Sequence, residues 1–107
     1  MSETLETIKN LAAARKVRIS DHGIEELFAD GITLKDVLES LPNARVVEDY
    51  PTAFKGPTVL AHHNVEGREI HVVWGLAKHT QDVATIVTAY VPDLEKWYDG
   101  FMLRKSK

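Results

Sequence analysis

The chain contains no cysteine, which excludes disulfide bonds, thiolate metal ligands, iron–sulfur clusters and a cysteine nucleophile. No apolar run approaches the roughly 18–20 residues that span a bilayer. The first six residues are acidic and lack the long apolar stretch of a secretory signal. We therefore expect a cytoplasmic protein that makes no membrane contact, and the sequence indicates no cofactor.

Net charge is only −3, but the charge is unevenly distributed along the 107 residues. Residues 21–49 hold eight acidic against two basic residues, a net charge of −6. Basic residues cluster near both ends, at Arg15-Lys16-Val17-Arg18 and at Arg104-Lys105-Ser106-Lys107. Nucleic-acid binders usually contact phosphates through clustered Lys and Arg. We interpret the basic ends as solvated termini, which would form one basic patch only if the termini meet.

Apolar spacing predicts three helices in the N-terminal half. The first covers residues 3–15, and a short extended piece follows at residues 17–19. Ser20 or Asp21 caps the second helix, which ends at Gly31. Residues 33–36 resemble a capping box that opens a third helix, stopped by Pro42. The positions expected to face the core are Ile24, Leu27 and Phe28 in the second helix and Leu34, Val37, Leu38 and Leu41 in the third.

The pattern then changes to strands, over residues 44–50, 58–64, 69–76 and 83–91. Pro92-Asp93 is expected to open a last helix, whose inner stripe would be Leu94, Trp97, Tyr98 and Phe101. Helices followed by a run of strands indicate an α+β fold. We therefore predict N-terminal helices packed on one face of a four-stranded antiparallel meander sheet, with a C-terminal helix.

Two registers are open for the hairpin around Asn64-Val65-Glu66-Gly67. A three-residue loop with a Gly bulge sets His63 opposite Glu69. A two-residue turn at Glu66-Gly67 instead sets His62 opposite His71. We favour the first, because two-residue type I′ turns prefer Asn or Asp before the Gly.

Alternation along residues 69–76 assigns side chains to the two sheet faces. Ile70, Val72, Trp74 and Leu76 should face the helices, and Glu69, His71, Val73 and Gly75 the other side. The favoured register groups His63, Glu69 and His71 on that second face. Three interpretations stay open: a solvated polar face, an acid–base site, or a metal site of two histidines and a carboxylate.

Five blocks of the chain carry a resemblance to a known family. They are Ile19-Ser20-Asp21-His22-Gly23-Ile24, residues 30–37, residues 46–51, Ile70-His71-Val72-Val73, and residues 86–92. In order and spacing they resemble a bacterial family known as domain of unknown function 4258. The resemblance covers about residues 18–98 of a single domain that we expect over residues 1–107.

The resemblance implies a fold similar to small RelE-like toxins and related metal-independent ribonucleases. It also implies candidate catalytic residues at His22, His71, Thr88 and Tyr90. A histidine would take the proton of the RNA 2′-hydroxyl, and a second histidine or Tyr90 would protonate the leaving oxygen. No metal would be needed.

Two departures weigh against efficient cleavage. Where the family usually carries arginine, this chain has Glu26 and Asp30, and a carboxylate opposes binding of the scissile phosphate. We therefore expect a toxin-related domain with weakened or lost ribonuclease activity, acting by binding a partner, perhaps a protein, at an exposed apolar patch near Trp74, Phe54 or Trp97. The alternatives are an active metal-independent endoribonuclease and a metal-binding module built on His63, Glu69 and His71.

Overall fold

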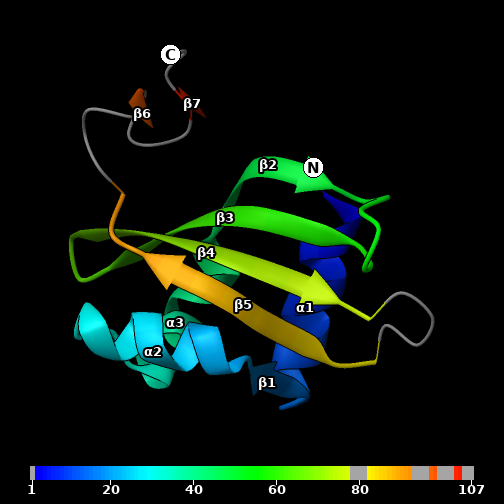
Figure 1. Cartoon of the computed structure of the whole chain (residues 1–107), viewed down its shortest axis with the longest axis horizontal. Coiled ribbons are helices and arrows are strands. Elements are labelled where there is room, and N and C mark those ends of the chain that lie inside the picture. Colours follow the sequence, from blue (N-terminus) through cyan, green and yellow to red (C-terminus); the bar gives the residue numbers. More distant parts are fainter. Residues whose placement is uncertain (1, 78–81, 93–96, 99–102, 105–107) are drawn as a thin grey trace.

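The computed structural model describes residues 2–77, 82–92, 97–98 and 103–104 (Figure 1). Helices precede the main run of strands, as predicted. The helices are α1 (Glu3–Ala13), α2 (Asp21–Ala29) and α3 (Leu34–Ser40), followed by the 3-10 helix η1 (Leu41–Asn43). The strands are β1 (Val17–Ile19), β2 (Arg45–Tyr50), β3 (Thr58–Val65), β4 (Arg68–Leu76), β5 (Ala84–Tyr90), β6 (Trp97–Tyr98) and β7 (Leu103–Arg104).

Side-chain caps fix where the helices begin. Ser20 Oγ accepts a hydrogen bond of 2.9 Å from the backbone N–H of Gly23, which makes Ser20 the cap of α2. At α3, Thr33 and Asp36 each accept from the other's backbone N–H, at 3.0 and 3.1 Å. The predicted capping box is therefore confirmed, with Asp in the place of the usual Glu.

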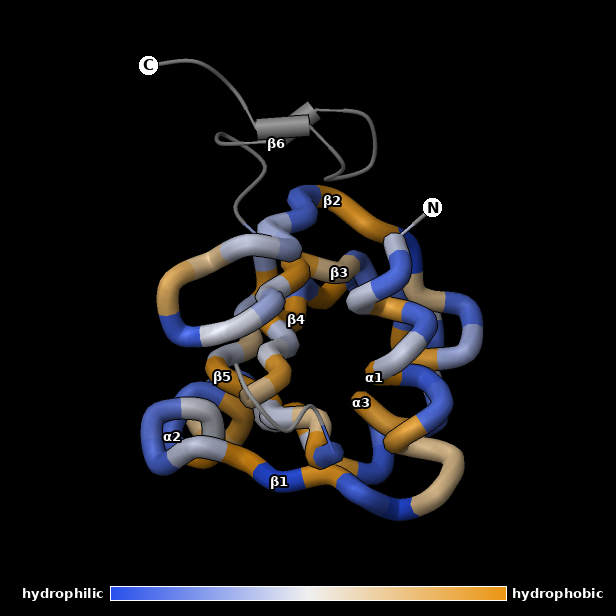
Figure 2. Tube along the Cα trace, turned by 90° about the vertical axis from the view of Figure 1, so that its right-hand side faces the viewer, coloured by the Kyte–Doolittle hydropathy of each residue, from blue (hydrophilic) through white to orange (hydrophobic). Residues whose placement is uncertain are grey.

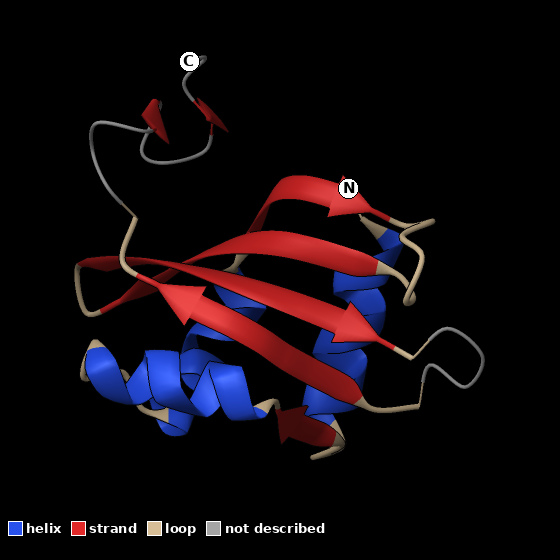
Figure 3. Ribbon diagram, viewed as in Figure 1, coloured by secondary structure: helices blue, strands red, loops and turns tan. Residues whose placement is uncertain are grey.

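The main sheet has five strands in the order β1-β5-β4-β3-β2 (Figure 3). Strands β2 to β5 form the predicted antiparallel meander. The prediction of four strands, all antiparallel, is wrong, because β1 pairs in parallel with the start of β5. The extended piece at residues 17–19 was recognised, but nothing in three residues of sequence tells which strand they will join.

Helix α2 follows directly where β1 ends, and it contacts β5. The Ser20 N–H donates to the carbonyl of Ile86 at 3.0 Å, and Ser20 Oγ donates to the carbonyl of Val87 at 2.7 Å. Gly23 allows the close approach, because a Cβ there would lie 2.9 Å from the Ile86 carbonyl oxygen. Ser20 therefore occupies backbone carbonyls of β5 that a longer β1 would have paired.

The core lies between the sheet and helices α1 and α3, which share one side of the strands (Figure 2). Helix α1 contacts β3, β4 and β5, and α3 contacts β3. The prediction that alternate residues of β4 face the helices is confirmed. Those residues, Ile70, Val72, Trp74 and Leu76, are all buried.

Three apolar residues predicted to lie in the core are instead exposed. Ile24 and Phe28 of α2 are 50% and 85% exposed, and Leu34 at the start of α3 is 40% exposed. Helix α2 buries only Gly23 and Leu27. The reason is that α2 lies along β5, so a narrow stripe of the helix suffices to cover its contact with the sheet.

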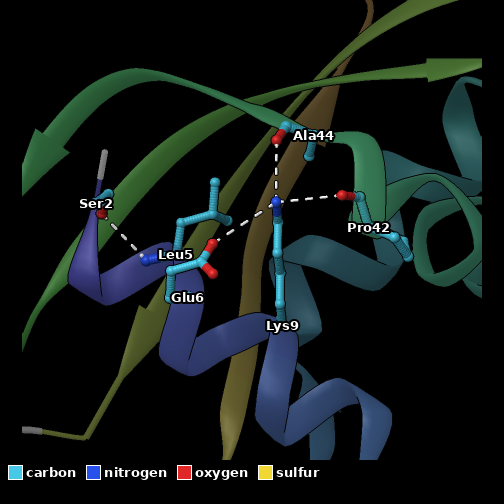
Figure 4. A network of polar contacts seen from close by, with 6 residues as sticks. All are labelled: Ser2, Leu5, Glu6, Lys9, Pro42 and Ala44. Carbon is cyan, nitrogen blue, oxygen red and sulfur yellow. Dashed lines mark hydrogen bonds and ion pairs between the residues drawn. The ribbon is translucent and has the colours of Figure 1, made fainter.

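Lys9 joins α1 to the start of β2 (Figure 4). Its Nζ donates to the carbonyl oxygens of Pro42 and Ala44, at 3.2 and 3.4 Å, and lies 3.8 Å from a carboxylate oxygen of Glu6. The two carbonyls belong to the turn that leads from η1 into the sheet. Lys9 therefore fixes the position at which the chain enters the sheet as β2, whose first residue is Arg45.

The predicted C-terminal helix is wrong at Trp97 and Tyr98. These residues form β6, which pairs antiparallel with β7. Neighbouring aromatic residues favour extended backbone, which outweighed the helical spacing seen in the sequence. The remaining members of the predicted stripe, Leu94 and Phe101, lie outside the described residues. Within the described part of the chain, no helix is long and apolar enough to cross a membrane.

Candidate functional site

The β3–β4 hairpin turns at Glu66 and Gly67, and this turn decides which histidines meet. Both residues have positive φ, 51° and 89°, as a two-residue type I′ turn requires. Val65 then pairs with Arg68, and His62 pairs with His71. The register favoured from the sequence is therefore wrong and the alternative is confirmed. The preference for Asn before Gly misled, because the chain places Glu66 in the left-handed conformation instead.

This register aligns four polar residues across four strands. Arg45 of β2 pairs with His62 of β3, His62 pairs with His71 of β4, and His71 pairs with Tyr90 of β5. Directly paired residues point to the same face of a sheet. We call Arg45, His62, His71 and Tyr90 the sheet-face row.

The adjacent row shows which face this is. Val46, Ala61, Val72 and Ala89 pair across the same four strands, one residue along from the sheet-face row. Ala61, Val72 and Ala89 have no exposed surface and belong to the core, and Val46 packs against them. Because successive residues of a strand alternate, the sheet-face row points away from the core under α1 and α3.

His62 is held from one side by Glu69. Its Nε2 contacts Oε2 of Glu69, which precedes His71 by two residues and so shares its face. A carboxylate only accepts hydrogen bonds, so Nε2 of His62 carries the proton and Nδ1 is the acceptor nitrogen of the neutral ring. The edge of one ring meets the face of the other in the His62–His71 pair, with centroids 5.9 Å apart.

His71 in turn contacts Tyr90. Its Nδ1 lies 3.2 Å from the phenol oxygen, and the ring centroids are 5.4 Å apart. A continuous series of contacts therefore runs from Glu69 through His62 and His71 to Tyr90.

Exposure varies along this series. His71 has no exposed surface, the His62 side chain is 11% exposed and the Glu69 side chain 34% exposed. Tyr90 is half-buried, and Arg45, at the β2 end, is exposed. The groups at both ends of the series thus reach the surface, while the His71 imidazole between them is shielded from water.

His63 does not belong to this cluster, contrary to the favoured grouping. It points into the core with no exposed surface, and its ring stacks on Trp74. Trp74 Nε1 donates to His63 Nε2 at 3.2 Å, which leaves the His63 proton on Nδ1 to be donated to Ser40 Oγ at 2.8 Å. Ser40 donates in turn to the carbonyl of Val37.

Burial, followed by the nearby His62 as the smaller cause, lowers the pKa of His63 from 6.5 to about 3. The hydrogen bonds give the same direction, because a charged ring would carry a second N–H facing the N–H of Trp74. His63 is therefore a neutral structural residue, and it is His62, not His63, that pairs with His71.

The other predicted site residues are placed in different ways. Thr88 is half-buried opposite Val73, two residues before Tyr90 and on the same strand. His22 lies on α2 with 63% of its side chain exposed, and its Nε2 is 3.7 Å from a carboxylate oxygen of Glu26. In the described part of the chain, no polar contact joins His22 to the sheet-face row.

The alternative of a metal site built on His63, Glu69 and His71 is not formed, because His63 lies on the other face of the sheet. Among the described residues, no group of three or more His, Asp or Glu side chains is arranged to hold a metal ion. The contacts of the sheet-face row instead suit proton transfer between neighbouring groups.

Two members of the row are not among the site residues predicted from the sequence. His62 faces His71 only in the register that we did not favour, and the sequence predicts no site role for Arg45. Alternation offered a signal for Arg45: the apolar pair Val46-Val47 follows it, so a strand starting there must send Arg45 and Val46 to opposite faces.

Comparison with known protein families gives a match that covers the strands of the candidate site. The family described as Domain of unknown function (DUF4258) matches residues 19–91, from the end of β1 to the residue after β5. The match includes every residue of the sheet-face row. Comparisons with curated proteins and with solved structures gave no match.

Proposed function

The chain belongs to the DUF4258 family, and from its sheet-face row we propose that it is a RelE-like, toxin-related domain that cleaves RNA without a metal ion. The observation that carries the proposal is the pairing of Arg45, His62, His71 and Tyr90 across four strands. This row combines a cation, two imidazoles and a phenol. Such groups can supply the general base, the general acid and the positive charge that favour phosphodiester transesterification.

His62 acts as the general base. Glu69 holds the Nε2–H of its ring, so Nδ1 is the nitrogen able to accept a proton. The same carboxylate stabilises the positive charge that the ring acquires when it takes a proton. Glu69 is thus a positioning residue, whose effect is exerted through His62.

Tyr90 acts as the general acid, supported by His71. Its hydroxyl lies within hydrogen-bonding distance of His71 Nδ1. His71 has no exposed surface, so it does not contact RNA itself. It returns a proton to the phenol after the phenol has donated one.

In the step itself, the 2′-oxygen of RNA forms a bond to phosphorus and the bond from phosphorus to the 5′-oxygen breaks. The proton of the 2′-hydroxyl passes to His62 Nδ1. The proton on the leaving 5′-oxygen comes from Tyr90, which regains one from protonated His71. The products are a 2′,3′-cyclic phosphate and a 5′-hydroxyl. His62 ends the step with one extra proton and His71 with one fewer, and proton exchange with solvent restores both, so the step needs no metal.

Arg45 supplies the positive charge that the family resemblance had located elsewhere. Glu26 and Asp30 stand where arginine was expected, but they lie at α2, outside the row. Arg45 is exposed at the His62 end and has no ion pair with a described residue. Its guanidinium is therefore available to neutralise the charge that develops on the phosphate.

The test is cleavage of single-stranded RNA oligonucleotides by the full chain in the presence of EDTA. We expect products ending in 2′,3′-cyclic phosphate. Oligonucleotides of the same sequence with 2′-deoxyribose throughout should stay intact, because they lack the attacking hydroxyl. RNA of every composition left uncut would overturn the proposal and would support the alternative, a toxin-related domain that has lost cleavage and acts only by binding a partner.

A further inference from the structure

Helix α2 carries an apolar stripe that the fold does not use. Ile24 and Phe28, one helical turn apart, are 50% and 85% exposed. The neighbouring stripe, Gly23 and Leu27, is buried and supplies the contact with β5. Helix α2 is therefore held without Ile24 and Phe28, which we call the α2 apolar stripe.

Carboxylates surround this stripe. Asp21, Glu25 and Glu26 lie on α2, and Asp30 caps its C-terminal end. No Lys or Arg occurs from residue 19 to residue 34. Among the described residues, Arg68 reaches the end of the helix, where its guanidinium donates to the backbone carbonyl of Asp30 at 2.8 Å.

The negative charge is not neutralised within the described part of the chain. Glu26 approaches His22, and Asp21, Glu25 and Asp30 form no ion pair with a described Lys or Arg. An anionic surface repels phosphate, which argues against RNA or an anionic membrane as its ligand. A ligand for this surface needs apolar groups for the stripe and cations for its borders.

We propose that the α2 apolar stripe binds a basic amphipathic helix of a partner protein. Such a helix presents apolar side chains at a spacing of three and four residues, with Lys or Arg on both sides. The apolar side chains would cover Phe28 and Ile24, and the basic ones would pair with the carboxylates that border them. This binding surface does not include the sheet-face row, so the inference stands independently of RNA cleavage.

The probe is a synthetic, fluorescently labelled amphipathic peptide with leucine along one helical face and lysine elsewhere. A peptide of the same composition in scrambled order keeps the charge but loses the apolar face. Binding to the full-length protein is followed by fluorescence anisotropy. We expect saturable binding of the amphipathic peptide, at least about tenfold tighter than binding of the scrambled one.

Phe28→Ala should weaken binding of the amphipathic peptide by about tenfold or more, since exposed aromatic residues at the centre of an interface contribute much of the affinity. The matched control is Phe54→Ala, because Phe54 is 86% exposed in the loop between β2 and β3. It should leave binding unchanged. Glu25→Gln should weaken binding mainly at low salt.

Three results would overturn the inference. Equal affinity for the amphipathic and scrambled peptides would reduce the surface to non-specific attraction of charge. Equal affinity of wild type and Phe28→Ala would remove the stripe from the interface. A dimer in sedimentation experiments that Phe28→Ala converts to monomer would assign the stripe to a second copy of this chain instead of a basic helix.

Discussion

His62 and His71 lie directly opposite each other on β3 and β4, with their ring planes at 81°. The register of one hairpin creates this relationship. A shift by one residue would turn His62 towards the helices and place His63, now a core residue, on the same face as His71. The candidate site therefore depends on the conformation of Glu66 and Gly67, more than 10 Å along the strands by the usual rise of about 3.4 Å per residue.

Glu66→Asn should stabilise the protein. Glu66 adopts a φ of 51°, which Asn tolerates better than Glu. We expect a gain of about 1 kcal/mol in the free energy of unfolding, measured by urea denaturation. Glu66→Val should have the opposite effect, since a β-branched side chain disfavours this conformation. A less stable Asn variant would show that the hairpin does not turn at Glu66 and Gly67.

Stability should fall as the pH drops below 6.5, through His63. The pKa of His63 is about 3 in the folded protein, below its ordinary 6.5, so between these values the unfolded chain binds a proton that the folded protein does not. The stabilising contribution is complete above pH 6.5 and is lost towards pH 3. Its full size is roughly 5 kcal/mol, at about 1.4 kcal/mol for each pH unit.

His63→Gln isolates this contribution from that of the carboxylates. A glutamine can still accept from Trp74 and donate to Ser40, but it does not titrate. Urea denaturation at a series of pH values should therefore give a shallower loss of stability for the variant than for wild type between pH 6.5 and pH 4. Parallel curves for the two proteins would contradict the neutral, buried state of His63.

Gly23→Ala should destabilise the protein, although Ala normally favours a helix over Gly by about 1 kcal/mol. An added Cβ would lie 2.9 Å from the Ile86 carbonyl oxygen and 3.1 Å from side-chain atoms of Ile19 and Ser20. We expect a loss of about 1–3 kcal/mol by thermal or urea denaturation. Glu25→Ala, on the exposed side of the same helix, should change stability by no more than about 0.5 kcal/mol. Similar stability of the two variants would mean that α2 does not approach β5 so closely.

Arg45→Gln should reduce RNA cleavage by about 10²–10³-fold, since it removes a charge that stabilises the transition state. Arg18→Gln is the matched control. Arg18 is also exposed, but it lies on β1, at the other edge of the sheet. Rates are compared under single-turnover conditions at fixed salt. Equal losses in the two variants would reduce Arg45 to a general contribution to RNA binding.

Local chemistry made much of the fold predictable. The caps at Ser20 and Thr33 and the alternation in β4 act over a few residues, so they can be predicted from the sequence. The fifth strand of the sheet could not be predicted, since Val17–Ile19 pairs with β5, which lies far away in the chain. For α2, apolar spacing alone could not tell whether Phe28 covers the sheet or faces solvent.

The candidate site was predictable in part for the same reason. Alternation along the strand requires that either His62 or His63 lies beside His71. Tyr90 was predicted from the family resemblance. Which histidine it is depends on a turn in which Glu66 takes a conformation that its residue type disfavours. Alternation with Val46 could indicate the face of Arg45, but its pairing with His62 depends on the position of β2 beside β3, which the sequence does not show.

The most direct test of the account compares RNA cleavage by wild type, His62→Gln, Tyr90→Phe and His22→Ala in EDTA, with circular dichroism to verify folding. Loss of the general base or the general acid should lower the rate by about 10²–10⁴-fold. His22→Ala should cleave like wild type, because His22 lies outside the sheet-face row. Wild-type rates in the folded His62 and Tyr90 variants would contradict the assignment of the sheet-face row as the active site.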